Sequence, residues 1–160
     1  MVLKILIFKI LFLLLLFSAN ITNAKTIMGK AKVIDGDTIH INKNKIRLHG
    51  IDAPEKKQKC IFNSKKWSCG KQSGIELKKL INHQTTKCYV KDVDIYNRYV
   101  AICYVNEVNL NQAMVKKGWA LAYKYYSTDY INEEYFAQNK KLGIWKGTFE
   151  LPYIYRKRNK

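Results

Sequence analysis

The sequence lacks the features that divide a chain into separate domains. It contains no internal repeat, no low-complexity tract and no linker rich in proline or glycine, and only 2 of its 160 residues are proline. A chain of this length fits one domain with a real hydrophobic core, but hardly two. We therefore expect one continuous domain.

A run long enough to span a membrane is also missing. The longest apolar stretch extends from Ile5 to Phe17 and is interrupted by Lys9, so it is shorter than the roughly 20 residues that a spanning helix needs. A lysine-bearing start, an apolar run and a small residue at Ala24 are the anatomy of a secretory signal peptide. We expect residues 1–24 to be removed, which predicts a secreted or periplasmic protein with no membrane attachment afterwards; an uncleaved anchor is the alternative.

Acidic residues are scarce: 12 Asp and Glu stand against 29 Lys and Arg, for a formal net charge of +17. The expected signal holds two lysines and no acidic residue, so its removal would leave +15. Such an excess attracts polyanions, of which nucleic acid is the commonest. A protein that binds anionic membrane surfaces would show the same excess, so charge alone leaves both open.

The cysteines lack the spacing of a zinc site. They include no C-x-x-C pair, and no histidine lies at ligand spacing beside them, which disfavours structural zinc. All of them follow the expected signal, and an exported chain meets an oxidising compartment in which thiols pair. We expect two disulfides among Cys60, Cys69, Cys88 and Cys103.

Residues 30–105 have mainly the pattern of short strands. The segments 38–41 and 46–49 alternate polar and apolar residues on either side of a turn-prone stretch, which predicts a hairpin with one buried face. Its parity places Ile46 on the buried face and Arg47 on the opposite one.

A second hairpin is predicted from the segments 87–91 and 99–105. Because the two strands are antiparallel, Cys88 and Cys103 face each other across the turn, and we expect them to form a disulfide. The remaining two cysteines, Cys60 and Cys69, then pair by elimination.

About three helices are predicted. One covers residues 70–82 with Ser68 as its N-cap. The second begins after Asn109, which caps it, and ends with Gly118 in the C′ position.

The last predicted helix follows a cap at Ser127 or Thr128 and stops at Gly143. Beyond it lies a basic C-terminal tail, residues 151–160, whose end from Arg156 onward we expect to be solvated and mobile. The order of elements predicts an α+β protein, and a five-stranded OB-fold barrel with packed helices is one way to bury its core. The pattern alone leaves other arrangements open.

Two loops concentrate carboxylates. Asp35 and Asp37 flank a glycine, while Asp52 and Glu55 flank a turn fixed by proline. Hard cations bind where several carboxylate and carbonyl oxygens converge from different loops. Turn formation alone explains Asp35, but it explains neither Glu55 nor Arg47 on the neighbouring strand.

Arg98 in the second hairpin supplies another guanidinium group. A metal, a carboxylate and two guanidinium groups are what phosphodiester cleavage needs, because together they neutralise the phosphate, activate water and stabilise the charge that develops. Arginine suits this task, since its planar fork binds two phosphate oxygens and stays charged.

The chain resembles the thermonuclease (staphylococcal nuclease-like) family in the strings VIDGDTI, IRLHGIDAPE, WSCG, DIYNRYVAICYV, LNQAMVKKGWALAY and LGIWKG. The resemblance covers nearly the whole mature chain and assigns residues 25–150 to one OB-fold domain with three helices. It implies a calcium-dependent endonuclease that acts on DNA and RNA and leaves 3′-phosphate ends. No stable protein partner is implied by the sequence, and we expect a monomer. Asn97 stands where the family commonly has glycine, and asparagine tolerates left-handed backbone angles.

The resemblance also implies roles for individual residues. Asp37 and Asp52 are implied as calcium ligands, with the carbonyl of Ala53 as a third. Glu55 is implied as the carboxylate that orients or deprotonates the attacking water. Asp35 is more typical of a turn or supporting residue.

Arg47 and Arg98 are implied as the clamp on the phosphate. Tyr96 lies beside Arg98 in the sequence, and Tyr123 and Tyr126 follow the second helix, so each could stack on a base or sugar. Tyrosines at such spacing are otherwise ordinary core or surface residues.

The main alternative is a nucleic-acid-binding module that keeps the barrel and has lost catalysis. Such a module should lack some of the catalytic residues, whereas this chain contains all of them. The histidines share no motif, so we assign them no nucleophilic or metal role. The sequence thus predicts the enzyme over the binding module, with residues Asp37, Arg47, Asp52, Glu55 and Arg98 at its centre.

Overall fold

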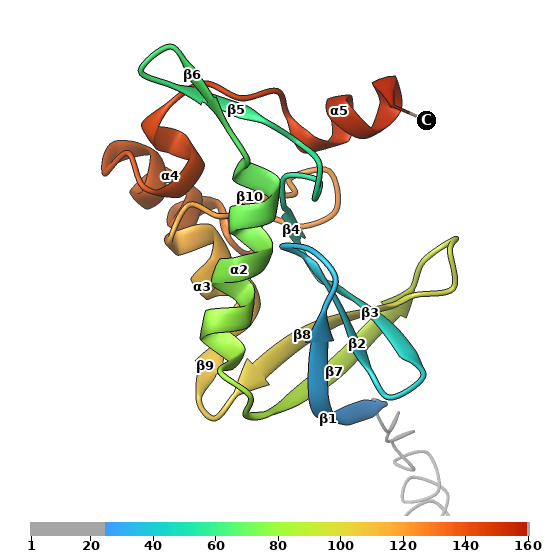
Figure 1. Ribbon diagram of the computed structural model, residues 1–160. Coiled ribbons are helices and arrows are strands. Elements are labelled where there is room, and N and C mark those ends of the chain that lie inside the picture. The colour runs from blue at the N-terminus through green and yellow to red at the C-terminus, as the bar shows by residue number, and fades with distance from the viewer. Residues whose placement is uncertain (1–24, 160) are drawn as a thin grey trace, which may run out of the picture.

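Five strands close into a β-barrel in the computed structural model, which describes residues 25–159 of the protein (Figure 1). The strands run in the order β3-β2-β1-β7-β8, and a parallel pairing of β3 with β8 closes the barrel. The predicted five-stranded OB-type barrel is confirmed. The expected signal, residues 1–24, lies outside the described residues. The barrel strands are β1 (Thr26–Val33), β2 (Thr38–Ile41), β3 (Asn44–Leu48), β7 (Thr85–Val93) and β8 (Tyr99–Val105).

Shorter strands extend this framework. Strand β9 (Val108–Asn109) pairs with the end of β8, and β4 (Ile51–Asp52) pairs with β10 (Leu121–Ala122). Strands β5 (Cys60–Phe62) and β6 (Lys65–Trp67) form a small separate hairpin. The β4–β10 pairing places Leu121 opposite Asp52 and so fixes the backbone position of this aspartate.

The first hairpin follows the alternation of the sequence. Strands β2 and β3 pair in a register that sets Thr38 opposite Arg47. Ile46 is 0% and Leu48 1% exposed, and they belong to the barrel core, while Arg47 remains only partly buried on the other face. The predicted facing of this strand is confirmed, and it directs the arginine away from the core.

Both predicted disulfides are present. Cys88 and Cys103 are paired residues in the β7–β8 register and are bonded, and Cys60 is bonded to Cys69. The first disulfide ties two barrel strands together. The second joins the β5–β6 hairpin to the start of α2 (Cys69–Ile81).

Three helices lie beside the barrel on one side of the molecule (Figure 1): α2, α3 (Leu110–Lys116) and α4 (Ile131–Asn139). The Asn109 side chain caps α3 by accepting a hydrogen bond from the backbone N–H of Gln112 at 3.1 Å. Gly118 follows α3 with φ +73°, which confirms the predicted C′ glycine.

The helix caps differ from the sequence expectation in two places. Ser68 precedes α2 but makes no capping bond, because its hydroxyl accepts a hydrogen bond from Lys59 Nζ at 2.6 Å. Helix α4 begins only after Tyr130, since the Ser127 hydroxyl is used by the backbone N–H of Asp129 at 3.1 Å. It ends before Gly143, which instead opens the 3-10 turn η1 (Gly143–Lys146).

The C-terminal segment differs most from what the sequence predicted. The prediction of a solvated, mobile tail is wrong, because residues Pro152–Arg158 form a further helix, α5. Proline at its first turn suits a helix start, and Leu151 packs into a second apolar cluster with Trp145 and Phe149. The described residues therefore contain four α-helices rather than three.

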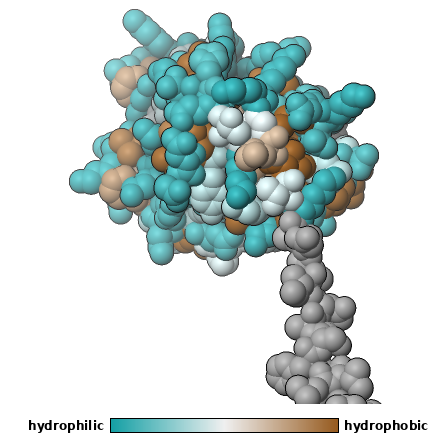
Figure 2. Space-filling view, turned by 90° about the horizontal axis from the view of Figure 1, so that it is seen from below, coloured by the Kyte–Doolittle hydropathy of each residue, from teal (hydrophilic) through white to brown (hydrophobic). Residues whose placement is uncertain are grey.

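The face of the molecule that is seen from below in Figure 2 is mainly hydrophilic. Seen from below, hydrophilic side chains cover most of the outline and leave only small apolar patches between them (Figure 2). No helix among residues 25–159 is long and apolar enough to cross a membrane.

Candidate active site

A broad cleft of about 1170 Å³ opens where the barrel meets α5. The β1–β2 loop, strand β3, the residues around β4, the tip of the β7–β8 hairpin, the segment 123–126 and α5 all contribute to its lining. The cleft therefore gathers segments that are distant in the sequence, and most of the predicted site residues line it.

Two aspartates meet at one arginine on the floor of the cleft. Arg47 Nη1 lies 3.0 Å from Asp37 Oδ1, and its Nη2 lies 3.1 Å from Asp52 Oδ1. The arginine side chain is 13% exposed and the aspartates 5% and 3%. These are paired, desolvated charges, so they hold one another in a fixed geometry.

Asp37 is held by further hydrogen bonds. The backbone N–H of Ala53 donates to Asp37 Oδ2 at 2.9 Å, and the Thr38 hydroxyl donates to Oδ1 at 3.0 Å. The glycine before Asp37 is required by packing, because a Cβ at Gly36 would lie 1.9 Å from Ser73 Oγ. The Asp-Gly-Asp loop thus packs directly against α2.

Burial and repulsion perturb the carboxylates of this loop. Burial, and then the charge of Asp37, raise the pKa of Asp35 to about 7. Burial also raises the pKa of Asp52, although the hydrogen bond from Arg156 opposes it. Negative charge is therefore crowded here, which is typical of a functional site.

Arg156 was missed by the sequence reasoning, which placed it in a mobile tail. Its Nη1 lies 2.7 Å from Asp52 Oδ1 and 2.9 Å from Glu55 Oε1. The sequence carried only a weak signal for this helix, namely Pro152 after a leucine ahead of the basic run. Glu55 itself is 32% exposed and lines the cleft.

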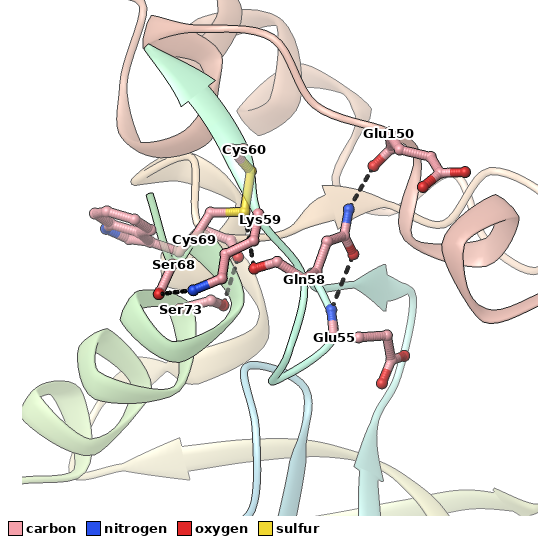
Figure 3. Close-up of a disulfide and its surroundings, with 9 residues drawn as sticks. Glu55, Gln58, Lys59, Cys60, Ser68, Cys69, Ser73 and Glu150 are labelled. Carbon is pink, nitrogen blue, oxygen red and sulfur yellow. Dashed lines mark hydrogen bonds between the residues drawn. A yellow bond between two sulfur atoms is a disulfide. The ribbon is translucent and has the colours of Figure 1, made fainter. Parts of the chain in front are cut away.

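Gln58 is a second residue that the sequence did not reveal. It is fully buried, and Figure 3 shows its amide between Glu55 and Glu150. Gln58 Oε1 accepts a hydrogen bond from the backbone N–H of Glu55 at 3.1 Å, and Nε2 donates to the Glu150 carbonyl at 2.6 Å. It therefore links the active-site turn to the chain that leads into α5.

Arg98 lines the same cleft from the β7–β8 hairpin. Its Nε and Nη2 each lie 2.7 Å from Asp94 Oδ2. Asn97 adopts φ 58°, so asparagine does take the left-handed conformation expected at this turn. The contacts of Arg98 are local to the hairpin, whereas Arg47 is tied to the carboxylates of the floor.

The predicted tyrosines all line the cleft. The Arg98 guanidinium lies 5.5 Å from the ring centre of Tyr96, and that of Arg47 lies 5.8 Å from the ring centre of Tyr123. Tyr126 packs edge-on against Tyr123 at 4.9 Å between ring centres. Two arginines of the cleft therefore lie beside aromatic rings, a combination that surfaces binding single-stranded nucleic acid also use.

The donor groups suit a hard cation, although residues 25–159 contain no three His, Cys, Asp or Glu side chains arranged as a metal site. The reason is visible in the contacts: Asp37, Asp52 and Glu55 direct oxygens at guanidinium groups. Carboxylate and carbonyl oxygens are the ligands that calcium prefers. The calcium-ligand assignment stays a prediction.

Known proteins resemble the chain over most of its length. Residues 45–147 match the family described as "Staphylococcal nuclease homologue". An uncharacterized endonuclease of Haemophilus influenzae is 36% identical over 149 residues, covering 89% of this chain and 78% of that protein. A micrococcal nuclease of Shigella flexneri is 31% identical over 147 residues, covering 81% and 79%. The succinoglycan biosynthesis protein ExoI of Rhizobium meliloti is 31% identical over 139 residues, covering 82% and 71%.

Proposed function

We propose that this chain, which belongs to the family of staphylococcal nuclease homologues, is an exported calcium-dependent nuclease. It hydrolyses phosphodiester bonds of DNA and RNA and leaves 3′-phosphate ends. Nuclease activity follows from the family and from relatives named endonuclease and micrococcal nuclease. The observation that carries the finer proposal is the pair of salt bridges by which Arg47 joins Asp37 to Asp52 in the cleft, beside Glu55.

Asp37, Asp52 and the carbonyl of Ala53 would hold the calcium ion. When bound, calcium supplies positive charge that polarises the phosphate and favours attack by water. The two aspartates come from the β1–β2 loop and from β4, and Arg47 already holds them together.

Glu55 acts on the attacking water. Before calcium binds, Arg156 engages its Oε1, and we assign Oε2 to accept a hydrogen bond or a proton from the water. Because Glu55 is 32% exposed, solvent reaches it from the cleft. Its backbone is fixed through Gln58, so the carboxylate stays in position during the reaction.

Arg47 and Arg98 bind the phosphoryl oxygens from two sides of the cleft. Both guanidinium groups are held by aspartates before substrate arrives, so they are oriented in advance for the charge that develops. The exposed Tyr96 ring and the Tyr123–Tyr126 pair offer surfaces on which bases or sugars stack. Phosphate contacts from this basic protein give affinity without sequence reading.

The proposal is tested with the purified protein from residue 25 onward, plasmid DNA and RNA. We expect digestion of both substrates with calcium and none when calcium is chelated. Product end groups can be identified by whether a phosphatase must act before the 3′ ends are extended. Tight DNA binding without cleavage at any calcium concentration would instead support the binding module.

A further inference from the structure

Arg156 contacts the same carboxylates that we assign to the cation and to the attacking water. One nitrogen, Nη1, lies 2.7 Å from Asp52 Oδ1 and 2.9 Å from Glu55 Oε1. Its side chain is 29% exposed, so the guanidinium lies at the boundary between the buried carboxylates and the open cleft. The Arg156 guanidinium therefore contacts the carboxylates at the floor and also lines the open cleft.

Helix α5 is anchored, so this contact is built into the fold. Gln58 binds the Glu150 carbonyl just before the helix (Figure 3), and Ile61 and Thr148 exchange two backbone hydrogen bonds of 2.9 Å. The Cys60–Cys69 disulfide fixes the hairpin that makes these bonds. The segment that precedes α5 is therefore held in place, and this positions Arg156 at the site.

The electrostatics of this arrangement oppose a bound cation. A guanidinium beside Asp52 and Glu55 lowers the negative potential there and occupies an oxygen of each carboxylate. A divalent ion bound to Asp52 would lie close to this positive charge, and like charges repel each other more strongly in a partly desolvated site than in bulk water. Either the ion or Arg156 has to give way.

We propose that Arg156 is the resident counter-ion of the cation site, displaced from Asp52 and Glu55 when calcium binds and then contacting the substrate phosphate. The proposal rests on the proposed function. Arg156 and Lys157 both line the cleft, so an Arg156 side chain released from the carboxylates stays within the cleft in which we expect nucleic acid to bind. Calcium and nucleic acid then bind cooperatively, because each favours the same position of Arg156.

The test is calcium binding measured by isothermal titration calorimetry without nucleic acid. We expect Arg156→Gln to bind calcium roughly 3- to 10-fold more tightly than wild type, because a nearby positive charge is removed. Arg158→Gln is the matched control: it makes the same charge change in the same helix, but Arg158 pairs with Glu150 and lies 62% exposed. Its calcium affinity should stay within about twofold of wild type.

The phosphate contact has its own readout. In the presence of calcium, the salt dependence of log(kcat/KM) on DNA should become shallower in Arg156→Gln by about 0.7 to 0.9, the value for one lost phosphate contact. Arg156→Lys retains the charge and should keep both calcium affinity and salt slope closer to wild type. Thermal unfolding of each variant verifies that it is folded.

A failure of the role inferred for Arg156 can be distinguished from a failure of the proposed nuclease function. Calcium affinity in Arg156→Gln no greater than in Arg158→Gln would overturn the displacement, and an unchanged salt slope would overturn the phosphate contact. If wild type, Arg156→Gln and Arg158→Gln all bound no calcium, the proposed function itself would fail.

Discussion

The two ends of the cleft are built differently. At the floor, Asp37, Arg47 and Asp52 are nearly buried and joined by salt bridges of 3.0 and 3.1 Å. At the hairpin tip, Tyr96 is 62% and Ile95 92% exposed. Packing therefore fixes the groups that we propose to hold a cation, whereas the groups that we propose to contact the nucleic acid stay accessible. Changes at the floor should therefore affect both stability and activity, and changes at the tip mainly activity.

The largest expected effect is on turnover. Arg98→Ala and Glu55→Gln should each lower kcat by roughly 10²- to 10³-fold, because each removes a group that acts on the developing charge or on the water. Neither side chain is fully buried, so circular dichroism should show native folding. Wild-type rates of DNA digestion by both folded variants would refute the mechanism.

Asp37→Ala should sharpen the contrast in stability. It removes a buried partner of Arg47 and strands the backbone N–H of Ala53, so the free energy of unfolding should fall by about 3 kcal/mol. The matched change at the tip, Asp94→Ala, should cost about 1 kcal/mol or less, because that pair is local and partly exposed. Urea unfolding measures both, and equal losses would erase the proposed difference.

The disulfide near the floor should matter more for the site than the one in the barrel. Replacing Cys60 and Cys69 with serine should cost about 2 to 3 kcal/mol of stability, the range for a short closed loop. It should also loosen the turn at Glu55 and the entry to α5, so activity should fall at temperatures where the protein is still folded. The corresponding Cys88 and Cys103 variant should keep its kcat while folded. A loss of kcat in the second variant alone would reverse this assignment.

The smallest expected effect is at the hairpin tip. Tyr96→Ala should raise KM for single-stranded DNA roughly tenfold with little change in kcat, because one stacking contact contributes about 1 to 3 kcal/mol. Tyr96→Phe keeps the ring and should behave like wild type. A fall in kcat with constant KM would assign the tyrosine to chemistry rather than to binding.

Sequence patterns predicted the parts of the site that depend on local structure. Alternation in the first hairpin gave the facing of Arg47, and strand register gave the Cys88–Cys103 bond. The resemblance to a known family identified the residues at the floor, which the structure brings together. Helix α5 was not predicted, because the resemblance implied a fold with three helices and the basic C-terminal run was interpreted as a mobile tail.

Contacts between distant segments escaped the sequence reasoning. The bond from Gln58 to Glu150 spans 92 positions, and that from Arg156 to Glu55 spans 101. No periodicity connects such pairs, so a basic run at the chain end resembled a free tail. Glu134 shows the same limit: it is buried in α4 and accepts a hydrogen bond from the Ala122 backbone N–H at 3.1 Å, whereas the neighbouring aromatic residue Tyr135 is 54% exposed.

A crystal structure of residues 25–160 grown with calcium would test the proposed cation site most directly. We expect one ion bound by carboxylate oxygens of Asp37 and Asp52 and by the carbonyl of Ala53, with Glu55 facing a water beside it. An ion bound elsewhere, or this position without an ion at calcium concentrations that support DNA cleavage, would rule out the proposed calcium site.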